Sequence, residues 1–359
     1  MAGTTVHALD DYYLAITLLI TVGYQLLFFS IAYTFKFDKV TDIAGGSNFI
    51  ILAVVTLAFS GHQDARQLIV SLCMVVWALR LSGYLFFRIL KTGKDDRFDE
   101  IRERFWAFLG FFVFQMLWVW LVSLPVTVLN SPAVQQYAQH PFGTARDIAG
   151  VVLFALGLVV ETVSDAHRYR FRSARTDKAA ICDTGLFHFS RHPNYFGEII
   201  VHFAIYTIAV SSAADGYVEG PAYGALYATI VGPAFLTFLL MFVSGLTLSE
   251  RPGAKKRYES DSPREWEAYS RYLRRTSILV PFPPGLYEPL PALLKRTLFL
   301  EFPIYVFDPV KHSDKKKQQQ QQSQTAAEPV TAVVVDEQQQ QQQQQQRESA
   351  DGLVETSRA

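Results

Sequence analysis

Cysteine is scarce in this 359-residue chain, and the patterns that mark several common soluble active sites are missing. The two cysteines, Cys73 and Cys182, lie far apart, and neither belongs to a CxxC pair. No disulfide framework or cysteine-based metal site is therefore predicted. The eight histidines are scattered, and neither a Gly-rich phosphate loop nor a nucleophile elbow occurs. We expect no metal at the site of this protein.

An excess of charge is missing too, because 33 basic residues balance 33 acidic ones. The total therefore points to no partner of opposite charge, and we expect no nucleic-acid partner. Half of the residues are apolar, and long stretches carry no charge at all. Such stretches predict an all-α membrane protein rather than a soluble core, because about 20 apolar residues per helix cross a bilayer.

Seven stretches are candidates for membrane spans, which predicts a helical bundle of about seven transmembrane helices embedded in a lipid bilayer. Three stretches contain ionisable side chains, namely Arg80, Glu161, and Glu198 with His202. The stretches are Tyr12–Phe35, Ile43–Ser60, Gln67–Phe87, Phe105–Asn130, Ile148–Ser164, Asn194–Ala214 and Ala222–Leu248.

Basic residues gather in the loops of one predicted face of the membrane. Loops 88–104 and 165–193 and the segment after residue 249 are rich in Lys and Arg, whereas the opposite loops hold only Arg66 and Arg146. Positively charged loops tend to stay in the cytosol. We therefore expect the basic face and the C-terminus to be cytosolic.

The organisation along the chain predicts four parts. Residues 1–147 are N-terminal transmembrane helices on the substrate side, and residues 148–284 form a C-terminal domain whose segment 250–275 is a folded cytosolic cap. Residues 285–310 are an extension on the membrane face. Residues 311–359 contain glutamine tracts, which bury too little apolar surface to fold alone, so we expect a disordered tail.

The densest group of polar and aromatic residues stands where a basic loop re-enters the membrane, from Cys182 to Glu198. Pro193 suits the first turn of a helix. A helix start beside Arg191 and His192 favours an anion such as a phosphate. Glu198 lies about one turn inside the membrane, where a carboxylate is costly unless it is paired or functional. Arg191 and His192 would equally serve as interfacial anchors, and both interpretations stay open.

A second group precedes it on a predicted helix. Glu161, Asp165, Arg168 and Arg172 recur at spacings of three or four residues and therefore share one face. Carboxylates toward the membrane and guanidinium groups toward water suit a ligand with hydroxyl or amide groups inside and phosphates outside. A helix end that satisfies its own charges is the alternative. Arg80, within a third span, needs a partner or a water-lined cavity.

Several of these motifs resemble the C-terminal domain of steroid 5-alpha-reductases, over about residues 148–284. The resemblance rests on Ser164-Asp165, on Gly185-Leu186-Phe187 followed by Pro193-Asn194-Tyr195-Phe196-Gly197-Glu198, and on Glu267-Ala268-Tyr269 leading to Leu279-Val280-Pro281-Phe282. The amino-acid sequence around Arg80–Arg104 and over residues 285–309 resembles a group of uncharacterised reductase-like membrane proteins, particularly fungal ones.

This resemblance implies a membrane oxidoreductase that uses NADPH to reduce a carbon–carbon double bond conjugated to a carbonyl, in a sterol or other lipid. It also implies the endoplasmic reticulum as the location. Tyr84, with Arg80 behind it, is the expected donor to the substrate oxygen, and Glu198 is the third catalytic candidate. The expected cofactor-binding residues are Glu161, Asp165, Arg168, Arg172, Arg191, His192, Asn194, Tyr195, Arg257, Tyr258 and Tyr269. Glu161 departs from the pattern, since steroid reductases usually carry an asparagine there.

Two alternatives remain open. Isoprenylcysteine and phospholipid methyltransferases, which use S-adenosylmethionine, share an Arg-His-Pro-x-Tyr-x-Gly run that matches Arg191–Gly197. Those enzymes usually carry adjacent glutamates after the last span, whereas Glu250 is followed by Arg251 here. A membrane scaffold that kept an old cofactor fold is the other alternative.

Overall fold

The computed structural model describes residues 5–36, 40–61, 64–92, 101, 103–177, 180–260 and 262–313. Most of the predicted basic loop 88–104 and of the predicted disordered tail therefore lies outside the described residues. The chain divides into two compact units. The first contains residues up to Ser249 and Ser270–Pro303, and the second contains Glu250–Tyr269 and the residues from Ile304 onward. Each unit is described by itself below.

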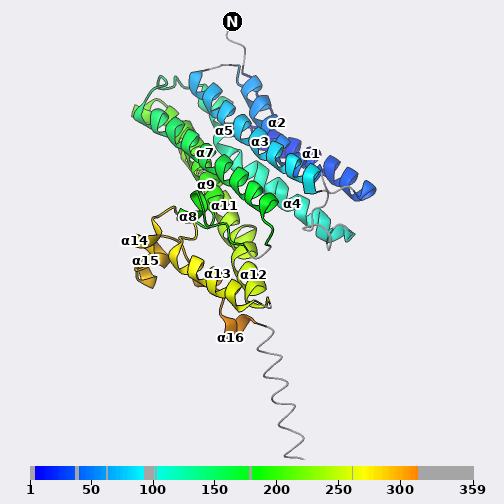
Figure 1. Ribbon diagram of the computed structural model, residues 1–359. Coiled ribbons are helices and arrows are strands. Elements are labelled where there is room, and N and C mark those ends of the chain that lie inside the picture. Colours follow the sequence, from blue (N-terminus) through cyan, green and yellow to red (C-terminus); the bar gives the residue numbers. More distant parts are fainter. Residues whose placement is uncertain are drawn as a thin grey trace, which may run out of the picture. The chain divides into compact units, whose positions relative to one another are not determined.

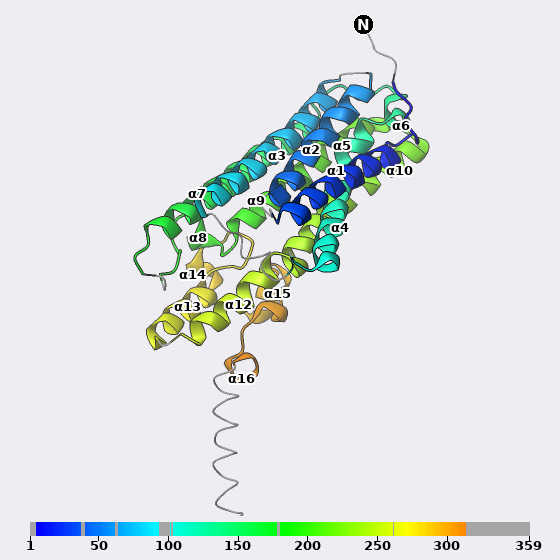
Figure 2. The same ribbon diagram turned by 90° about the vertical axis from the view of Figure 1, so that its right-hand side faces the viewer.

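The first unit is helical, and its described part contains no β-strand, as predicted. Its long helices run beside one another, as Figures 1 and 2 show. They are α1 (Leu14–Phe35), α2 (Val40–Phe59), α3 (Ala65–Thr92), α4 (Phe105–Val122), α7 (Ala145–Ala174) and α9 (Pro193–Val210). Short helices connect or follow them: α5 (Leu124–Leu129), α6 (Pro132–Gln135), α8 (Leu186–Phe189), α14 (Pro284–Tyr287) and α15 (Ala292–Thr297).

Six segments of the described chain are long and apolar enough to cross a membrane. They are Leu14–Phe35, Ala65–Phe87, Phe105–Val122, Ala145–Ala174, Pro193–Gly216 and Gly220–Tyr258. A seventh apolar helix, Ile43–Phe59, is shorter. The polytopic helical architecture predicted from the uncharged runs is confirmed, with the second run forming the short helix.

Two of the predicted spans are interrupted. The helix expected to run to Asn130 ends at Val122, and α5 starts again with Pro125 in its first turn. The last run forms α10 (Gly220–Ala228), α11 (Val231–Phe238), a π-helical turn (Leu239–Val243) and α12 (Leu246–Tyr258). Pro125 lies in the first turn of α5 and Pro233 in the first turn of α11, where the N–H that proline lacks has no partner within the helix. Pro252 lies inside α12. Hydropathy alone does not reveal these interruptions.

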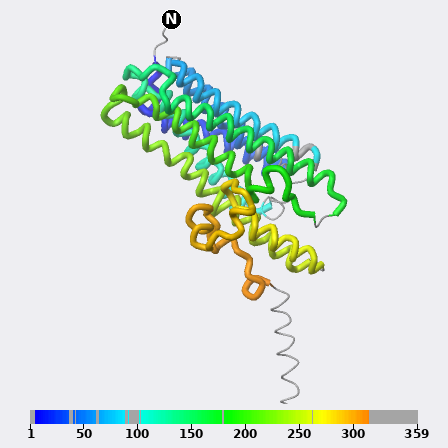
Figure 3. Tube along the Cα trace, turned by 60° about the vertical axis from the view of Figure 1, so that its left-hand side comes forward, coloured from blue at the N-terminus to red at the C-terminus, as the bar shows by residue number. Residues whose placement is uncertain are grey.

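Helices α7 and α9 form the tightest helix pair, and Figure 3 shows them side by side in green. A Cβ atom on Gly157 would lie 2.8 Å from the carbonyl oxygen of Gly197, and a Cβ on Gly197 would lie 2.7 Å from the carbonyl oxygen of Gly157. Small residues allow this close backbone approach, which is typical of membrane helix pairs. The contact aligns Glu161 on α7 with the first turns of α9.

The second unit contains the end of α12, the start of α13 (Pro263–Arg275) and α16 (Pro309–His312). Tyr258, Trp266 and Phe307 contact one another, with ring centroids 5.3 to 5.6 Å apart. Burial, with a smaller contribution from the charge of Glu250, raises the pKa of Tyr305 to about 12. Aromatic packing therefore gives this short unit a core of its own.

Candidate functional site

Arg80 of α3 joins two acidic residues of α7 inside the membrane-spanning part of the first unit. Its two terminal nitrogens donate to the carboxylates of Glu161 and Asp165. The Glu161 side chain is only 2% exposed, and those of Arg80 and Asp165 are 12% and 13% exposed. The partner that Arg80 was predicted to need is thus the acidic face of α7. Because that partner comes from another helix, α7 does not satisfy its own charges.

Glu198 of α9 is a third carboxylate near this pair. It lies within electrostatic range of Arg80, Asp165 and Glu161. None of the described residues forms a hydrogen bond with its carboxylate. Around the buried carboxylate of Glu161, Arg80 is the single cation that contributes in the described part of the chain. Three carboxylates therefore share one guanidinium group, an arrangement that is costly in a low dielectric unless a proton or a cationic group balances it.

Several buried polar atoms of the same region have no hydrogen-bond partner among the described residues. They include the second carboxylate oxygen of Glu161, the amide oxygen of Asn194, the indole nitrogen of Trp77 and Nε2 of His202. The Trp77 indole lies near Glu161, but the two do not form a hydrogen bond of standard geometry. The rings of Trp77 and His202 meet edge to face at 4.2 Å. Unsatisfied buried polar atoms are rare, and a cluster of them indicates capacity for a ligand.

The start of α9 is held from the C-terminal side of the first unit. Pro193 occupies the first turn of α9, as predicted. The backbone N–H of Arg191 donates to the carbonyl of Ser277 at 2.8 Å, and the buried guanidinium of Arg191 pairs with Glu301. Glu301 also accepts a hydrogen bond from the Tyr287 hydroxyl at 2.7 Å. Sequence reasoning missed Glu301, because nothing local in the sequence connects residues 110 positions apart.

The other predicted residues at this end have mixed surroundings. His192 and Tyr195 stack with ring centroids 5.1 Å apart. Arg168 lies over the Phe187 ring at 4.6 Å and donates to the backbone carbonyl of Arg191 at 3.1 Å. Arg172 is exposed on α7 beyond Arg168. Arg168 and Arg191 therefore have structural contacts that a bound phosphate would have to share or replace.

The loop before α8 lies outside the spans and contains Cys182. Burial is the main cause that raises the pKa of its thiol, and the nearby charge of Arg168 only partly offsets this effect. Asp183 next to it pairs with Arg275 at 2.7 Å. Gly185 has a positive φ of 58°, and a Cβ there would lie 2.7 Å from His167. The Gly-Leu-Phe motif thus makes a tight turn against α7.

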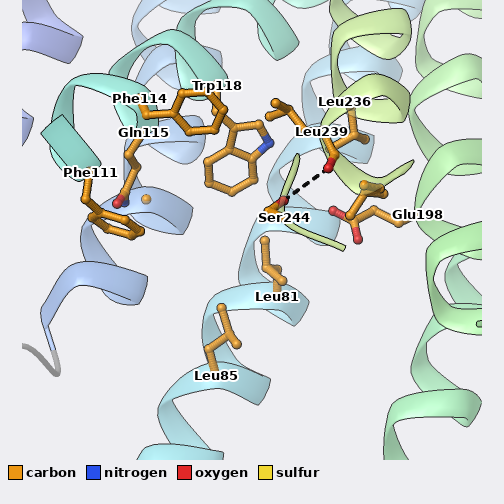
Figure 4. Close-up of a pocket in the computed structure, with 12 residues that line it drawn as sticks. Leu81, Leu85, Phe111, Phe114, Gln115, Trp118, Glu198, Leu236, Leu239 and Ser244 are labelled. Carbon is orange, nitrogen blue, oxygen red and sulfur yellow. Dashed lines mark hydrogen bonds between the residues drawn. The ribbon is translucent and has the colours of Figure 1, made fainter. Parts of the chain in front are cut away.

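An apolar cavity of about 230 Å³ opens beside Glu198 (Figure 4). Its walls come from α2, α3, α4, α9, α11 and the π-helical turn, and Glu198 is the one ionisable residue that lines it in the described part of the chain. The lining residues are Gly45, Leu81, Leu85, Phe111, Phe114, Gln115, Trp118, Glu198, Leu236, Leu239, Leu240 and Ser244. π-helical turns are frequent at functional sites. The cavity and the carboxylate cluster are therefore adjacent, and Glu198 belongs to both.

Tyr84, predicted as the donor to a substrate oxygen, does not line this cavity. It lies beside Arg80 and Asp165 in a separate hollow between α3 and α7, and the Arg80 guanidinium is 5.7 Å from its ring. Arg257, Tyr258 and Tyr269 belong to the second unit, where Arg257 lies 4.6 Å over the Tyr269 ring. Their predicted contact with a cofactor stays a prediction.

The residues of the first unit fit a cofactor that carries hydroxyl groups and positive charge. The free carboxylate oxygen of Glu161 accepts hydrogen bonds, and so does the amide oxygen of Asn194. In the described part of the chain, no three His, Cys, Asp or Glu residues are arranged to hold a metal ion.

Comparison with known proteins places the chain in a family. Residues 28–276 match the model of a protein family of unknown function, DUF1295, and the chain belongs to this family. The family is related to the steroid 5-alpha-reductase-like superfamily. A curated relative from Ustilaginoidea virens, named probable O-methyltransferase ustE, is 28% identical over 156 residues, which are 41% of this chain and 53% of the relative. The chain thus spans about half the length of that relative. No solved structure matches this chain.

Proposed function

We propose that this protein is a membrane methyltransferase that binds S-adenosylmethionine beside the carboxylate cluster of α7 and α9 and acts on an apolar substrate in the adjacent cavity. The observation that carries the proposal is the surplus of carboxylates, since Arg80 pairs with both Glu161 and Asp165 and is the one cation that contributes at Glu161 and Glu198 among the described residues. When bound, this cofactor supplies an electrophilic methyl group on a positively charged sulfur. A site with surplus negative charge favours such a group over an uncharged one.

Three further observations support the proposal. Glu161 replaces the asparagine usual in steroid reductases, which adds one negative charge to the site. Arg191, which begins the motif shared with methyltransferases, is occupied by Glu301 and is less available to a dinucleotide phosphate. The relative from Ustilaginoidea virens carries the name of an O-methyltransferase.

The residues have distinct roles in this proposal. Asn194 and Glu161 accept hydrogen bonds from the cofactor, and Arg80 holds the Glu161 and Asp165 carboxylates in place. Arg191 and Glu301 fix the start of α9 and are positioning residues. Glu198 faces the substrate. The basic end of the bundle would lie in the cytosol, where the cofactor is available, and the endoplasmic reticulum is the membrane we propose.

NADPH-dependent reduction of a conjugated double bond in a sterol or other lipid is the second candidate. It is favoured by the relation to the steroid 5-alpha-reductase-like superfamily and by Arg168 and Arg172, which continue the face of α7 beyond Asp165 and suit phosphates. In this candidate Tyr84 stays the predicted donor to the substrate oxygen, although it lies in its own hollow and Glu198 lines the apolar cavity.

Parallel binding measurements separate the candidates. Full-length protein in nanodiscs is tested by calorimetry and by thermal stabilisation with S-adenosylmethionine, S-adenosylhomocysteine, NADPH, NADP⁺ and NADH. We expect S-adenosylmethionine to bind about tenfold tighter than S-adenosylhomocysteine, which lacks the positive sulfur. Binding of NADPH alone would overturn the methyltransferase in favour of the reductase, and binding of no cofactor would support the scaffold.

Two variants locate the cofactor. Glu161→Gln should reduce the preference for the charged sulfur while S-adenosylhomocysteine still binds. Asn194→Ala should abolish the stabilisation by either ligand without lowering expression. Glu219→Gln, an exposed acid outside the site, is the matched control. Unchanged cofactor binding in Asn194→Ala would show that the cofactor lies elsewhere.

A further inference from the structure

The polar groups of the apolar cavity differ in what they offer a ligand. The side-chain nitrogen of Gln115 donates to the backbone carbonyl of Thr41 at 2.8 Å. The Ser244 hydroxyl donates to the backbone carbonyl of Leu239, which Figure 4 marks with a dashed line. Glu198 forms no hydrogen bond with any described residue, and Figure 4 shows its carboxylate near Ser244 at one side of the cavity. The Glu198 carboxylate therefore retains acceptor capacity on this side of the cavity.

The apolar part of the cavity wall favours ligands with an apolar group of limited width. Leucines and the rings of Phe111, Phe114 and Trp118 form it. An apolar cavity of about 150 Å³ is known to hold one benzene molecule. The cavity of about 230 Å³ therefore holds one aromatic ring or a comparable piece of chain, and it encloses only part of a four-ring sterol.

The charge of the cavity determines which polar group a bound ligand can carry. Among the described residues, Glu198 is the cavity's one ionisable lining residue, and none of the lining residues is basic. A carboxylate or phosphate on the ligand would meet the like charge of Glu198 in an apolar wall, and the nearby Arg80 is already paired with Glu161 and Asp165, which makes such a ligand strongly unfavourable. A neutral hydroxyl, in contrast, donates the hydrogen bond that Glu198 lacks.

We infer that the cavity binds a neutral, hydroxyl-bearing apolar molecule of single-ring width, whose hydroxyl donates to Glu198. This inference rests on the proposed function, because it names the acceptor class of that methyltransferase. It excludes lipid carboxylates and phospholipid headgroups as acceptors. Glu198 is the specificity-determining residue.

A matched set of ligands tests the inference without turnover. Binding of 4-octylphenol, 4-octylanisole and 4-octylbenzoate to the full-length protein in nanodiscs is measured against empty nanodiscs of the same composition. The three share a ring and a tail, but the anisole has no donor and the benzoate is anionic. We expect the phenol to bind about tenfold or more tightly than either of the others, as a hydrogen bond to a charged group predicts.

Glu198→Gln should remove most of this discrimination, because the amide neither repels the benzoate nor carries the charge that favours the phenol. The control variant Glu219→Gln should keep the preference for the phenol. Equal binding of the three ligands to the wild-type protein, or a preference that survives Glu198→Gln, would overturn the inference.

Cofactor binding in the same samples keeps the two proposals apart. If S-adenosylhomocysteine binds but the phenol is not preferred, the acceptor class is wrong and the methyltransferase stands. If the phenol is preferred but only NADPH binds, the cavity is assigned correctly as a hydroxyl site and the methyltransferase is wrong.

Discussion

Helices α3 and α7 are joined by arginine–carboxylate contacts at two places, and the two contacts differ in how completely they satisfy their partners. Arg66 binds both oxygens of Asp147, at 3.0 and 2.8 Å, and donates to the backbone carbonyls of His140 and Pro141. Asp147 also accepts from the backbone N–H groups of Gly143 and Thr144. Hardly any hydrogen-bonding capacity is left for a ligand.

The contact of Arg80 has the opposite character. One guanidinium group serves Glu161 and Asp165, a third carboxylate is close, and an oxygen of Glu161 stays without a partner. A saturated ion pair connects helices and excludes ligands, whereas an unbalanced one retains affinity for a cation or a donor. The comparison separates a saturated ion pair from one that keeps binding capacity, although both use the same residue types on the same two helices.

The largest expected effect is on the saturated pair. Arg66→Ala leaves the Asp147 carboxylate buried without its cation, so we expect a loss of about 3–5 kcal/mol in unfolding free energy. Unfolding in mixed micelles measures it. The double variant Arg66→Met with Asp147→Leu, which removes both charges, should recover most of the loss. A loss below about 1 kcal/mol in the single variant would show that the pair is not structural.

Glycine substitutions compare the packing of α7 and α9 near each pair. A Cβ on Gly197 meets two backbone atoms, at 2.7 and 2.8 Å, whereas a Cβ on Gly150 first meets a side-chain atom of Ile208 at 2.4 Å. Since backbone cannot move aside, Gly197→Ala should cost about 1–3 kcal/mol and displace Glu161. Gly150→Ala should cost less. Equal unfolding free energies in the two variants would contradict this view of the helix pair.

The unfolding free energy of Glu161→Gln tests whether the Arg80 cluster carries surplus negative charge. Because it removes one of three competing carboxylates, unfolding free energy should stay within about 0.5 kcal/mol of wild type or rise, as is common at functional sites. The equivalent change at the saturated pair, Asp147→Asn, should destabilise. Thermal unfolding of both variants without cofactor measures the contrast. A clear destabilisation by Glu161→Gln would mean that the charge cluster is already balanced.

The smallest expected effect concerns Cys182 near the basic end. Because burial raises the pKa of this thiol, the reactive thiolate forms at higher pH than in an ordinary cysteine. Alkylation by iodoacetamide should therefore be slow at pH 8 and accelerate above the usual thiol range. A Cys73→Ala background isolates the signal. An alkylation rate at pH 8 equal to that of a free cysteine would contradict the shielding.

Local patterns in the sequence predict much of this protein. Uncharged runs of about 20 residues specify membrane helices, because the cost of burying charge acts residue by residue. Helical spacing alone places Glu161 and Asp165 on one face, and Pro193 marks the start of α9. The need of Arg80 for a partner also follows from its position within a span.

The identities of the partners depend on tertiary structure. The pairs Arg80–Glu161, Arg66–Asp147 and Arg191–Glu301 join residues 81 to 110 positions apart. No local pattern specifies such pairs, since they depend on which helices pack together and in what register. The sequence by itself therefore determined the spans and the residues able to carry chemistry. Packing alone decided that Glu198 faces an apolar cavity while Tyr84 does not, because side-chain direction across helices is set by contacts between distant segments.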